Sequence, residues 1–214
     1  MGAKLSVIIP AAGEIENHFF TETLAMLSKF QNVEVICIEL VAAKTRAERL
    51  NLGFAKAQGH MILFYHPRSY LDPKGIQFLL EKSDEICWGA FTHAFDFSHP
   101  LLKFTSWYSN KIRGKLAGIF YLDHCIFFHR SLWKKNLPEI EIFEDTVLSQ
   151  NLRNQSKPIL LPFLSTTSAI RFTKNGLWKQ AIMNQILKIG FHLHIPHSVM
   201  NKIYEKGLNL NSEK

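Results

Sequence analysis

The sequence lacks long apolar runs and has few cysteines. No run of about 18 uncharged apolar residues and no basic leader before an apolar segment occurs in its 214 residues, so we expect neither a membrane span nor a secretory signal. Cys37, Cys87 and Cys125 are odd in number and each stands among apolar residues. They indicate three buried, reduced thiols in a cytoplasmic protein rather than a disulfide framework or a zinc site.

Acidic residues are absent from a long C-terminal stretch. Thr146 to Tyr204 contains no Asp or Glu, although the net charge of the whole chain is +7. The basic residues of this stretch are Arg153, Lys157, Arg171, Lys174, Lys179, Lys188 and Lys202. Such a surface indicates a negatively charged partner, either the phosphates of a small ligand, anionic lipid or nucleic acid. No known nucleic-acid-binding module accompanies the charge, so we expect no nucleic-acid partner.

Repeats, low-complexity tracts and linkers are also absent, which predicts one domain over residues 1–214. Apolar strand-like runs alternate with segments of helical spacing. The strand-like runs are 4–10, 33–39, 61–65, 86–91 and 119–129, and the helical segments are 17–30, 45–59, 73–82 and 143–153. This alternation predicts an α/β fold in which helices flank a mostly parallel sheet.

Four segments in order resemble the signatures of family-2 glycosyltransferases with the GT-A fold. They are "SVIIPAAGE" (6–14), "RAERLNLGFAKAQGHMILFYH" (46–66), "FEDTVLSQNLR" (143–153) and "TSAIRFTKNGLW" (167–178). The sequence is most similar to small bacterial members that end in a Ser-Ala-x-Arg-aromatic stretch and apolar basic helices. The resemblance implies a single GT-A-like, Rossmann-like domain. Residues 1–100 would bind a nucleotide-sugar donor and residues 101–214 would hold the acceptor and the C-terminal helices.

The resemblance also implies roles for particular residues. Asp145, next to Glu144, would be the catalytic base that takes the acceptor proton, and Arg171 would lie on the acceptor side. Asp123 stands among apolar residues, where a carboxylate is costly unless it is bonded or lies at the cleft, so we expect an acceptor-side role for it as well. The implied donor-binding residues are Pro10, Ala11, Glu14, Glu39, Arg46, Asn51, His66, Arg68 and Ser69. Simpler interpretations stay open: Glu144 and Asp145 also suit the first turn of any helix, Glu39 could cap the next helix, and Arg68 could be a solvated loop residue.

One departure from the family concerns metal. Where the family has an acidic motif that binds Mg²⁺ or Mn²⁺, this sequence has Pro67, Arg68 and Ser69. A guanidinium cannot bind a cation, so we expect no metal requirement, unless Glu39, His66 or Asp72 supplies other ligands. The same departure leaves open a catalytically inactive relative that binds a nucleotide sugar, a lipid or a protein.

The C-terminal region has more apolar surface than one helix face needs. Residues 174–191 have helical spacing with apolar side chains well beyond a single stripe, and residues 101–118 mix apolar, aromatic and basic side chains in the same way. We expect this helix to contact an anionic membrane surface, at the inner face of the membrane, or a second copy in a homodimer. The acceptor could then be linked to lipid.

Overall fold

The computed structural model describes residues 3–11 and 18–208. Its centre is a seven-stranded sheet in the order β2-β1-β3-β6-β5-β7-β4. The strands are β1 (Leu5–Pro10), β2 (Val33–Ile38), β3 (Met61–Phe64), β4 (Ser69–Leu71), β5 (Trp88–Phe95), β6 (Ile126–His129) and β7 (Ile159–Thr167). Strands β2, β1, β3, β5 and β7 run one way, whereas β6 and β4 run the other way. The predicted α/β fold with a mostly parallel sheet is therefore confirmed.

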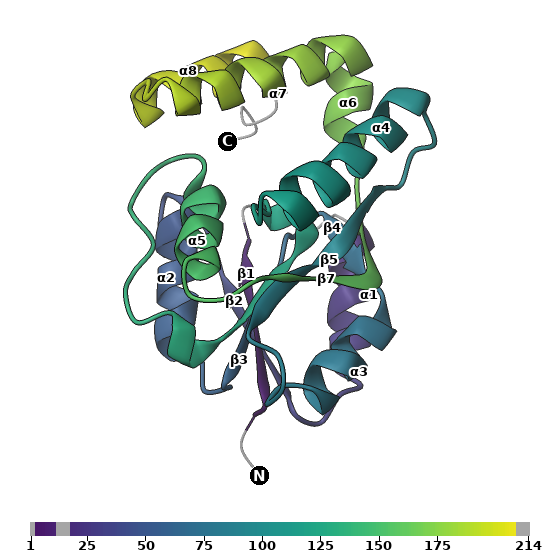
Figure 1. Ribbon diagram of the computed structural model, residues 1–214, viewed down its shortest axis with the longest axis vertical. Coiled ribbons are helices and arrows are strands. Elements are labelled where there is room, and N and C mark those ends of the chain that lie inside the picture. The colour runs from purple at the N-terminus through teal and green to yellow at the C-terminus, as the bar shows by residue number, and fades with distance from the viewer. Residues whose placement is uncertain (1–2, 12–17, 209–214) are drawn as a thin grey trace.

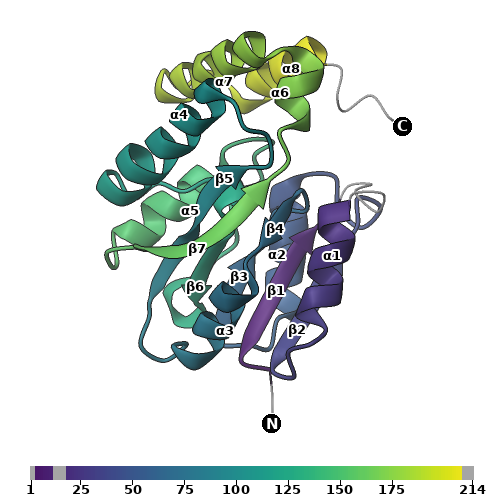
Figure 2. The same cartoon turned by 90° about the vertical axis from the view of Figure 1, so that its right-hand side faces the viewer.

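Helices cover both faces of the sheet. They are α1 (His18–Leu27), α2 (Arg46–Lys56), α3 (Pro73–Glu81), α4 (Pro100–Tyr108), α5 (Glu144–Arg153), α6 (Ile170–Asn175), α7 (Leu177–His192) and α8 (His197–Leu208). Helices α1 and α3 lie on one face, α2 and α5 lie on the other, and α7 with α8 forms a further layer beyond one edge of this sandwich (Figures 1 and 2). Two buried apolar clusters, one on each face of the sheet, make up most of the core.

Local sequence signals explain why α2 and α3 begin where they do. Thr45 and Glu48 form a capping box, in which the Glu48 amide donates to Thr45 Oγ1 at 3.1 Å and the Thr45 amide donates to Glu48 Oε2 at 3.0 Å. Asp72 caps α3 by accepting a hydrogen bond from the Lys74 amide at 2.9 Å. In α2, a Cβ on Gly53 would lie 2.3 Å from Ile8 Cγ2, so this glycine lets α2 pack closely on β1.

Strand β7 was not predicted, because a proline interrupts its sequence. Pairing with β5 shifts register between Phe91 and Thr92, which face Leu161 and Leu164 respectively. Pro162 therefore lies in a β-bulge, where a residue without an amide hydrogen costs no ladder bond. The 119–129 strand was also too long: residues Leu122–His124 form the short 3₁₀ helix η3, and only Ile126–His129 are extended.

Two further sequence expectations need correction. The helix expected over residues 174–191 is divided at Gly176, whose φ of +86° separates α6 from α7. Of the three cysteines expected to be buried, only Cys125 is, while Cys37 and Cys87 are exposed. Cys37 lies on the edge strand β2, which has one uncovered side. Over the described residues, no helix is both long and apolar enough to cross a membrane.

Candidate functional site

The amino-terminal ends of α2 and α5 meet through charged side chains. Arg46, the first residue of α2, donates from Nε to Glu144 Oε1 and from Nη2 to Asp145 Oδ2, the latter at 3.2 Å. The Leu122 amide also donates to Asp145 Oδ2, at 2.9 Å. Glu144 is fully buried and Asp145 nearly so, while a third of the Arg46 side chain reaches solvent. The structure therefore joins Arg46, a predicted donor-binding residue, to Glu144 and Asp145, the predicted catalytic residues.

The surroundings of Asp145 suit a proton acceptor. Burial raises the pKa of Asp145 to about 6, Arg46 opposes this effect, and the neighbouring Glu144 adds to it. At neutral pH the carboxylate is therefore ionised, yet it holds a proton more readily than an exposed aspartate does. Its position at the amino-terminal end of α5 also places its negative charge where the helix dipole favours it.

Asp123 is the third carboxylate of this region, and its side chain is more exposed to solvent than those of Glu144 and Asp145. Ser165 Oγ donates to the Asp123 carbonyl at 2.7 Å, which attaches η3 to β7, and 31 % of the Asp123 side chain is exposed. His93 Nε2 lies 3.7 Å from Asp123 Oδ2. Burial alone would raise the pKa of Asp123, but His93, His124 and Arg113 together hold it well below its ordinary value. Asp123 is therefore ionised at neutral pH.

The loop after β3 brings positive charge to the same place. His66 Nδ1 lies 3.2 Å from Ser69 Oγ, and the Ser168 amide donates to the Arg68 carbonyl at 2.9 Å. Burial lowers the pKa of His66 well below its ordinary value, and the charges of Arg68, Arg46 and Arg171 lower it further. His66 is thus neutral at pH 7, although Asp123 opposes these effects on its pKa.

Arg171 lies on α6, three residues after Ser168, whose amide donates to the Arg68 carbonyl. Its Cζ lies 5.0 Å from the centroid of the Tyr204 ring, so α8 packs over this arginine. Ser69 has a structural role instead: it is completely buried, and its Oγ lies 2.6 Å from Thr167 Oγ1. The hydrogen bonds of Ser69 join the loop after β3 to the carboxyl end of β7.

Sequence reasoning gave no individual role to Arg113, Tyr121 or Lys188, which contact one another at this site. Arg113 lies in η2 (Ser109–Leu116), the π-helical continuation of α4, and its Cζ lies 3.5 Å from the centroid of the Tyr121 ring. Lys188 approaches the same ring from α7, with Nζ 5.8 Å from the centroid. Burial lowers the pKa of Lys188 to about 8, with Arg113 adding to this effect and Asp123 opposing it. No local signal marked these residues, because α4, η3 and α7 come together only in the folded chain.

Asn51, Glu39, Pro10 and Ala11 are the other predicted donor-binding residues that the structure describes. Asn51 donates to the Leu137 carbonyl at 3.0 Å and accepts from the Leu137 amide at 2.7 Å, so its amide fastens the segment before α5 to α2. Glu39 is exposed just beyond the edge strand β2. Pro10 ends β1 and Ala11 follows it as a buried residue, whereas Glu14 lies outside the described residues.

The described residues do not fit a divalent cation. Among them, no three His, Cys, Asp or Glu side chains lie close enough together to hold a metal ion. Arg46 engages Glu144 and Asp145, and the remaining carboxylate, Asp123, stands among cations and histidines. A hard divalent ion prefers several oxygen ligands, which this part of the chain does not offer.

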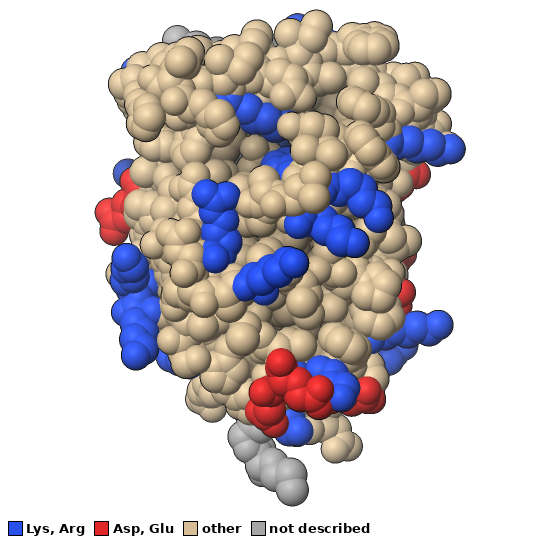
Figure 3. All heavy atoms as spheres, in the orientation of Figure 1, with Lys and Arg blue, Asp and Glu red and all other residues tan. Residues whose placement is uncertain are grey.

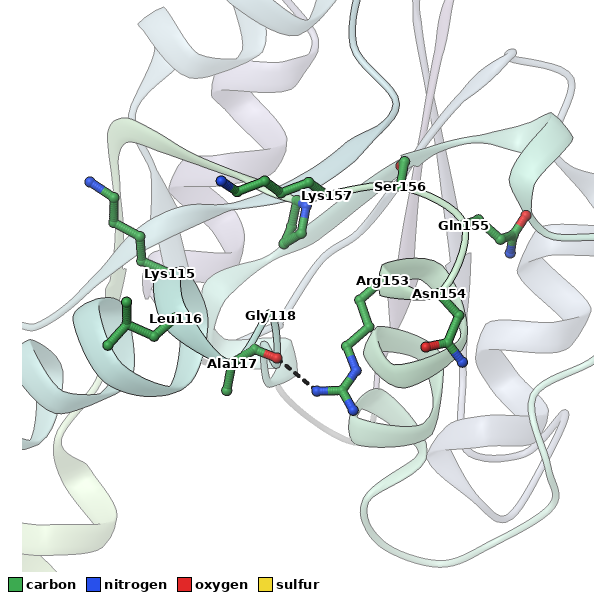
Figure 4. Close-up of a pocket in the computed structure, with 10 residues that line it drawn as sticks. Lys115, Leu116, Ala117, Gly118, Arg153, Asn154, Gln155, Ser156 and Lys157 are labelled. Carbon is green, nitrogen blue, oxygen red and sulfur yellow. Dashed lines mark hydrogen bonds between the residues drawn. The ribbon is translucent and has the colours of Figure 1, made fainter.

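A separate hollow of about 500 Å³ lies near the other end of α5. Its walls come from residues 115–118 and 153–158, and Arg153 Nη1 donates to the Ala117 carbonyl at 2.8 Å, as Figure 4 shows. None of the residues assigned to the site above lines this hollow. It is therefore not part of the cluster around Asp123.

Comparison with protein-family models and with curated proteins gives no match. Solved structures are similar in fold. S. aureus TarS 1–349 has a TM-score of 0.57 and 14 % identity, over 96 % of this chain and 71 % of that one. The same fragment with UDP-GlcNAc has a TM-score of 0.56 and 15 % identity, over 96 % and 72 %. The mannosyltransferase PcManGT from Pyrobaculum calidifontis, with GDP-Man and Mn²⁺, has a TM-score of 0.62 and 12 % identity, over 87 % and 63 %. The GT-A-like fold is thereby shown.

Proposed function

We propose that this protein is a glycosyltransferase that moves a sugar from a nucleoside-diphosphate sugar to a hydroxyl group of an acceptor. The observation that carries the proposal is the placement of His66 and Arg68 directly after β3, beside the segment that leads into α6 and Arg171, since the Ser168 amide donates to the Arg68 carbonyl at 2.9 Å. It occurs in a fold shared with structures that contain UDP-GlcNAc or GDP-Man. Ligands of α/β sheets bind beyond the carboxyl ends of strands, where His66 and Arg68 follow β3.

The arginines suit the chemistry at the donor. As the bond between the sugar C1 and the phosphate oxygen breaks, the leaving diphosphate takes the electron pair and gains negative charge. Guanidinium groups bind phosphate oxygens in pairs and stay charged at any physiological pH. Arg68 and Arg171 would hold the leaving group, so that the reaction needs no divalent metal.

Asp145 is the proposed general base. The acceptor oxygen would attack C1 from the side opposite the diphosphate, with inversion, while its proton passes to the Asp145 carboxylate. The raised pKa of about 6 supports this role, because the carboxylate is ionised at pH 7 and still basic. Glu144 would fix Arg46, and the more exposed Asp123 would bind a hydroxyl of the acceptor.

A second candidate function is binding of a nucleotide sugar, a lipid or a protein without turnover. The observation that favours it is that both oxygens of the proposed base already accept hydrogen bonds: Oδ2 from Arg46 and the Leu122 amide, and Oδ1 from the Thr146 amide. Incubation with a panel of nucleoside-diphosphate sugars separates the two. Ligand-induced thermal stabilisation followed by release of nucleoside diphosphate supports the transferase, whereas stabilisation without release on any acceptor tested supports the binding protein.

A further inference from the structure

Helix α7 has one side buried against the protein and one exposed apolar side. Gln180, Leu187 and Gly190 are buried toward the rest of the protein. On the other face, the side chains of Trp178, Ile182, Ile186, Ile189 and Leu193 form what we call the α7 ridge, and each is between 50 % and 69 % exposed. Their spacing of four, four, three and four residues places all five on one side of the helix. No described element of the chain covers this ridge.

Exposed apolar residues also occur on the helices near α7. Val199 and Ile203, four residues apart on α8, are exposed as well. On α4, Phe104 and Trp107 are half exposed or more, and their rings stack with centroids 5.8 Å apart. Figure 2 shows α4 beneath α7, and in Figures 1 and 2 α7 and α8 form the outermost layer at one end of the molecule. The ridge is thus accessible to a large, flat partner.

The charges around the ridge indicate the chemistry of that partner. Lys174, Lys179 and Lys202 are exposed on α6, α7 and α8, and the sequence from Ile170 to Tyr204 contains no Asp or Glu. On the face shown in Figure 3, Lys and Arg side chains lie across the upper and middle parts, whereas acidic side chains lie at the edges and the lower end. An apolar ridge flanked by lysines complements a surface with an apolar interior and negative groups at its boundary.

A second copy of this chain fits the ridge less well. Two copies joined through α7 would bring the lysines of both helices together, with no carboxylate on the ridge side between Ile170 and Tyr204 to pair with them. Like charges placed side by side in an interface oppose association. Trp178, at one end of the ridge, has the amphipathic indole that is enriched at the boundary between lipid and water.

We propose that α7 lies flat on an anionic lipid bilayer, with the α7 ridge inserted among the acyl chains and Lys174, Lys179 and Lys202 at the phosphate level. Attachment is peripheral, and it does not depend on the proposed sugar transfer. Apolar burial supplies the depth of insertion, while the lysines select anionic headgroups. Because charge attraction is screened over about 10 Å at 0.1 M salt, binding should weaken as salt rises.

The test is co-sedimentation of the full chain with vesicles of phosphatidylcholine alone or mixed with phosphatidylglycerol. We expect binding to the mixed vesicles only. Ile182→Gln/Ile189→Gln should reduce the partition coefficient by about 100-fold or more, since each isoleucine loses its burial in lipid. The matched control is Val41→Gln/Leu52→Gln, which changes one exposed apolar residue in the connection between β2 and α2 and one on α2, and it should bind like the wild type.

A second pair of variants tests the charge. Lys174→Gln/Lys179→Gln should weaken binding about 25-fold, whereas Lys29→Gln/Lys56→Gln, with the same loss of net charge on exposed lysines elsewhere, should have little effect. Circular dichroism and thermal unfolding would establish that each variant is folded. The proposal would be overturned if the wild-type protein did not co-sediment with the anionic vesicles. So would a stable dimer that separates on Ile182→Gln/Ile189→Gln, because the ridge would then bind a second copy.

Discussion

Arg46 donates a hydrogen bond to Asp145 at 3.2 Å, although the two residues are 99 positions apart in the sequence. A guanidinium at the amino-terminal end of a helix is unfavourable with respect to that helix's own dipole, and Arg46 is the first residue of α2. The carboxylates that it contacts stand at the amino-terminal end of α5, where negative charge is favoured. The placement of Arg46 is therefore explained by its partners on α5 and not by α2.

Replacing Arg46 by Gln should destabilise the protein in a pH-dependent way. The change leaves Glu144 and Asp145 buried without their cation, which costs about 3 kcal/mol of unfolding free energy at pH 7. At pH 5 the loss should be smaller, since one carboxyl group can then take up a proton. Urea unfolding at both pH values measures the difference.

Two variants control for the Arg46 experiment. Arg153→Gln removes an exposed guanidinium at the other end of α5 and should change stability little. Arg46→Gln/Glu144→Gln restores the charge balance and should recover part of the loss at pH 7. An equal loss at pH 5 and pH 7 would contradict the electrostatic explanation.

Sequence patterns were sufficient wherever structure is determined locally. Short-range signals account for the βαβ unit at the beginning of the chain, the capped start of α2 at Thr45 and the start of α3 at Asp72. Strand β7 was missed because Pro162 is tolerated only in a bulge, whose position depends on β5. The break at Gly176 was missed because the apolar spacing continues on both sides of it.

The candidate site was predictable only in part, because some of its residues come together only through tertiary packing. Sequence reasoning pointed to Arg46 and Asp145, which the structure joins by a hydrogen bond, and to Arg68, whose carbonyl accepts from Ser168 near Arg171. It pointed equally to Asn51, whose amide instead holds the backbone of Leu137. Lys188 and Arg113 reach the cluster from elements that meet it only through tertiary packing, so no spacing rule could have found them.

Replacing Asp145 by Asn should stop catalysis while leaving donor binding intact. Asn keeps an oxygen that can accept the Leu122 amide hydrogen but cannot take a proton from the acceptor. We expect the transfer rate to fall about 10²-fold or more, the usual loss for a positioned base. Nucleoside-diphosphate release gives the rate, and thermal shift gives the affinity for donor. The control is Asp84→Asn, which changes an exposed side chain, and unchanged activity in Asp145→Asn would remove this residue from the mechanism.

Buried histidines should make the protein less stable as pH falls below about 6.5. His124 Nδ1 lies 3.0 Å from the Phe91 carbonyl, to which it must donate, so Nε2 is left to accept from Arg113 Nη2 at 3.2 Å. Burial, assisted by Arg113 and His93, lowers the pKa of His124 to about 3, although Asp123 opposes this. The unfolded chain takes up this proton near pH 6.5 and the native state does not. The stability that depends on neutral His124 is thus fully present above pH 6.5 and lost as pH falls.

His124→Gln isolates this contribution, because the amide can replace one donor and one acceptor without titrating. Between pH 6.5 and 4.5 the wild type should lose about 2 kcal/mol more unfolding free energy than the variant. The raised pKa of Asp145 has the opposite effect on stability, because the native carboxyl group takes up a proton at a higher pH than the unfolded one. This effect is the same in the wild type and in His124→Gln, so it cancels in the difference. Parallel stability curves from urea titrations would show that His124 is already protonated in the native state.

Arg68 should supply positive charge to a bound diphosphate in place of a metal ion. It follows β3 at the point where acidic metal ligands were expected from the resemblance, and its charge acts on the buried His66 beside it. Arg68→Ala should therefore weaken nucleoside-diphosphate binding by about 1.5 to 3 kcal/mol, the range for a charged hydrogen bond, and EDTA should leave the wild-type affinity unchanged. Arg153→Ala, which removes an exposed guanidinium beside the hollow of Figure 4, should bind normally in the same titration. Binding that requires Mn²⁺ and survives Arg68→Ala would assign the phosphates to a metal site built from other residues, such as Glu39, His66 or Asp72. If no nucleotide binds with or without Mn²⁺, the arginines serve another anion, and the non-catalytic alternative gains because a transferase must first hold its donor.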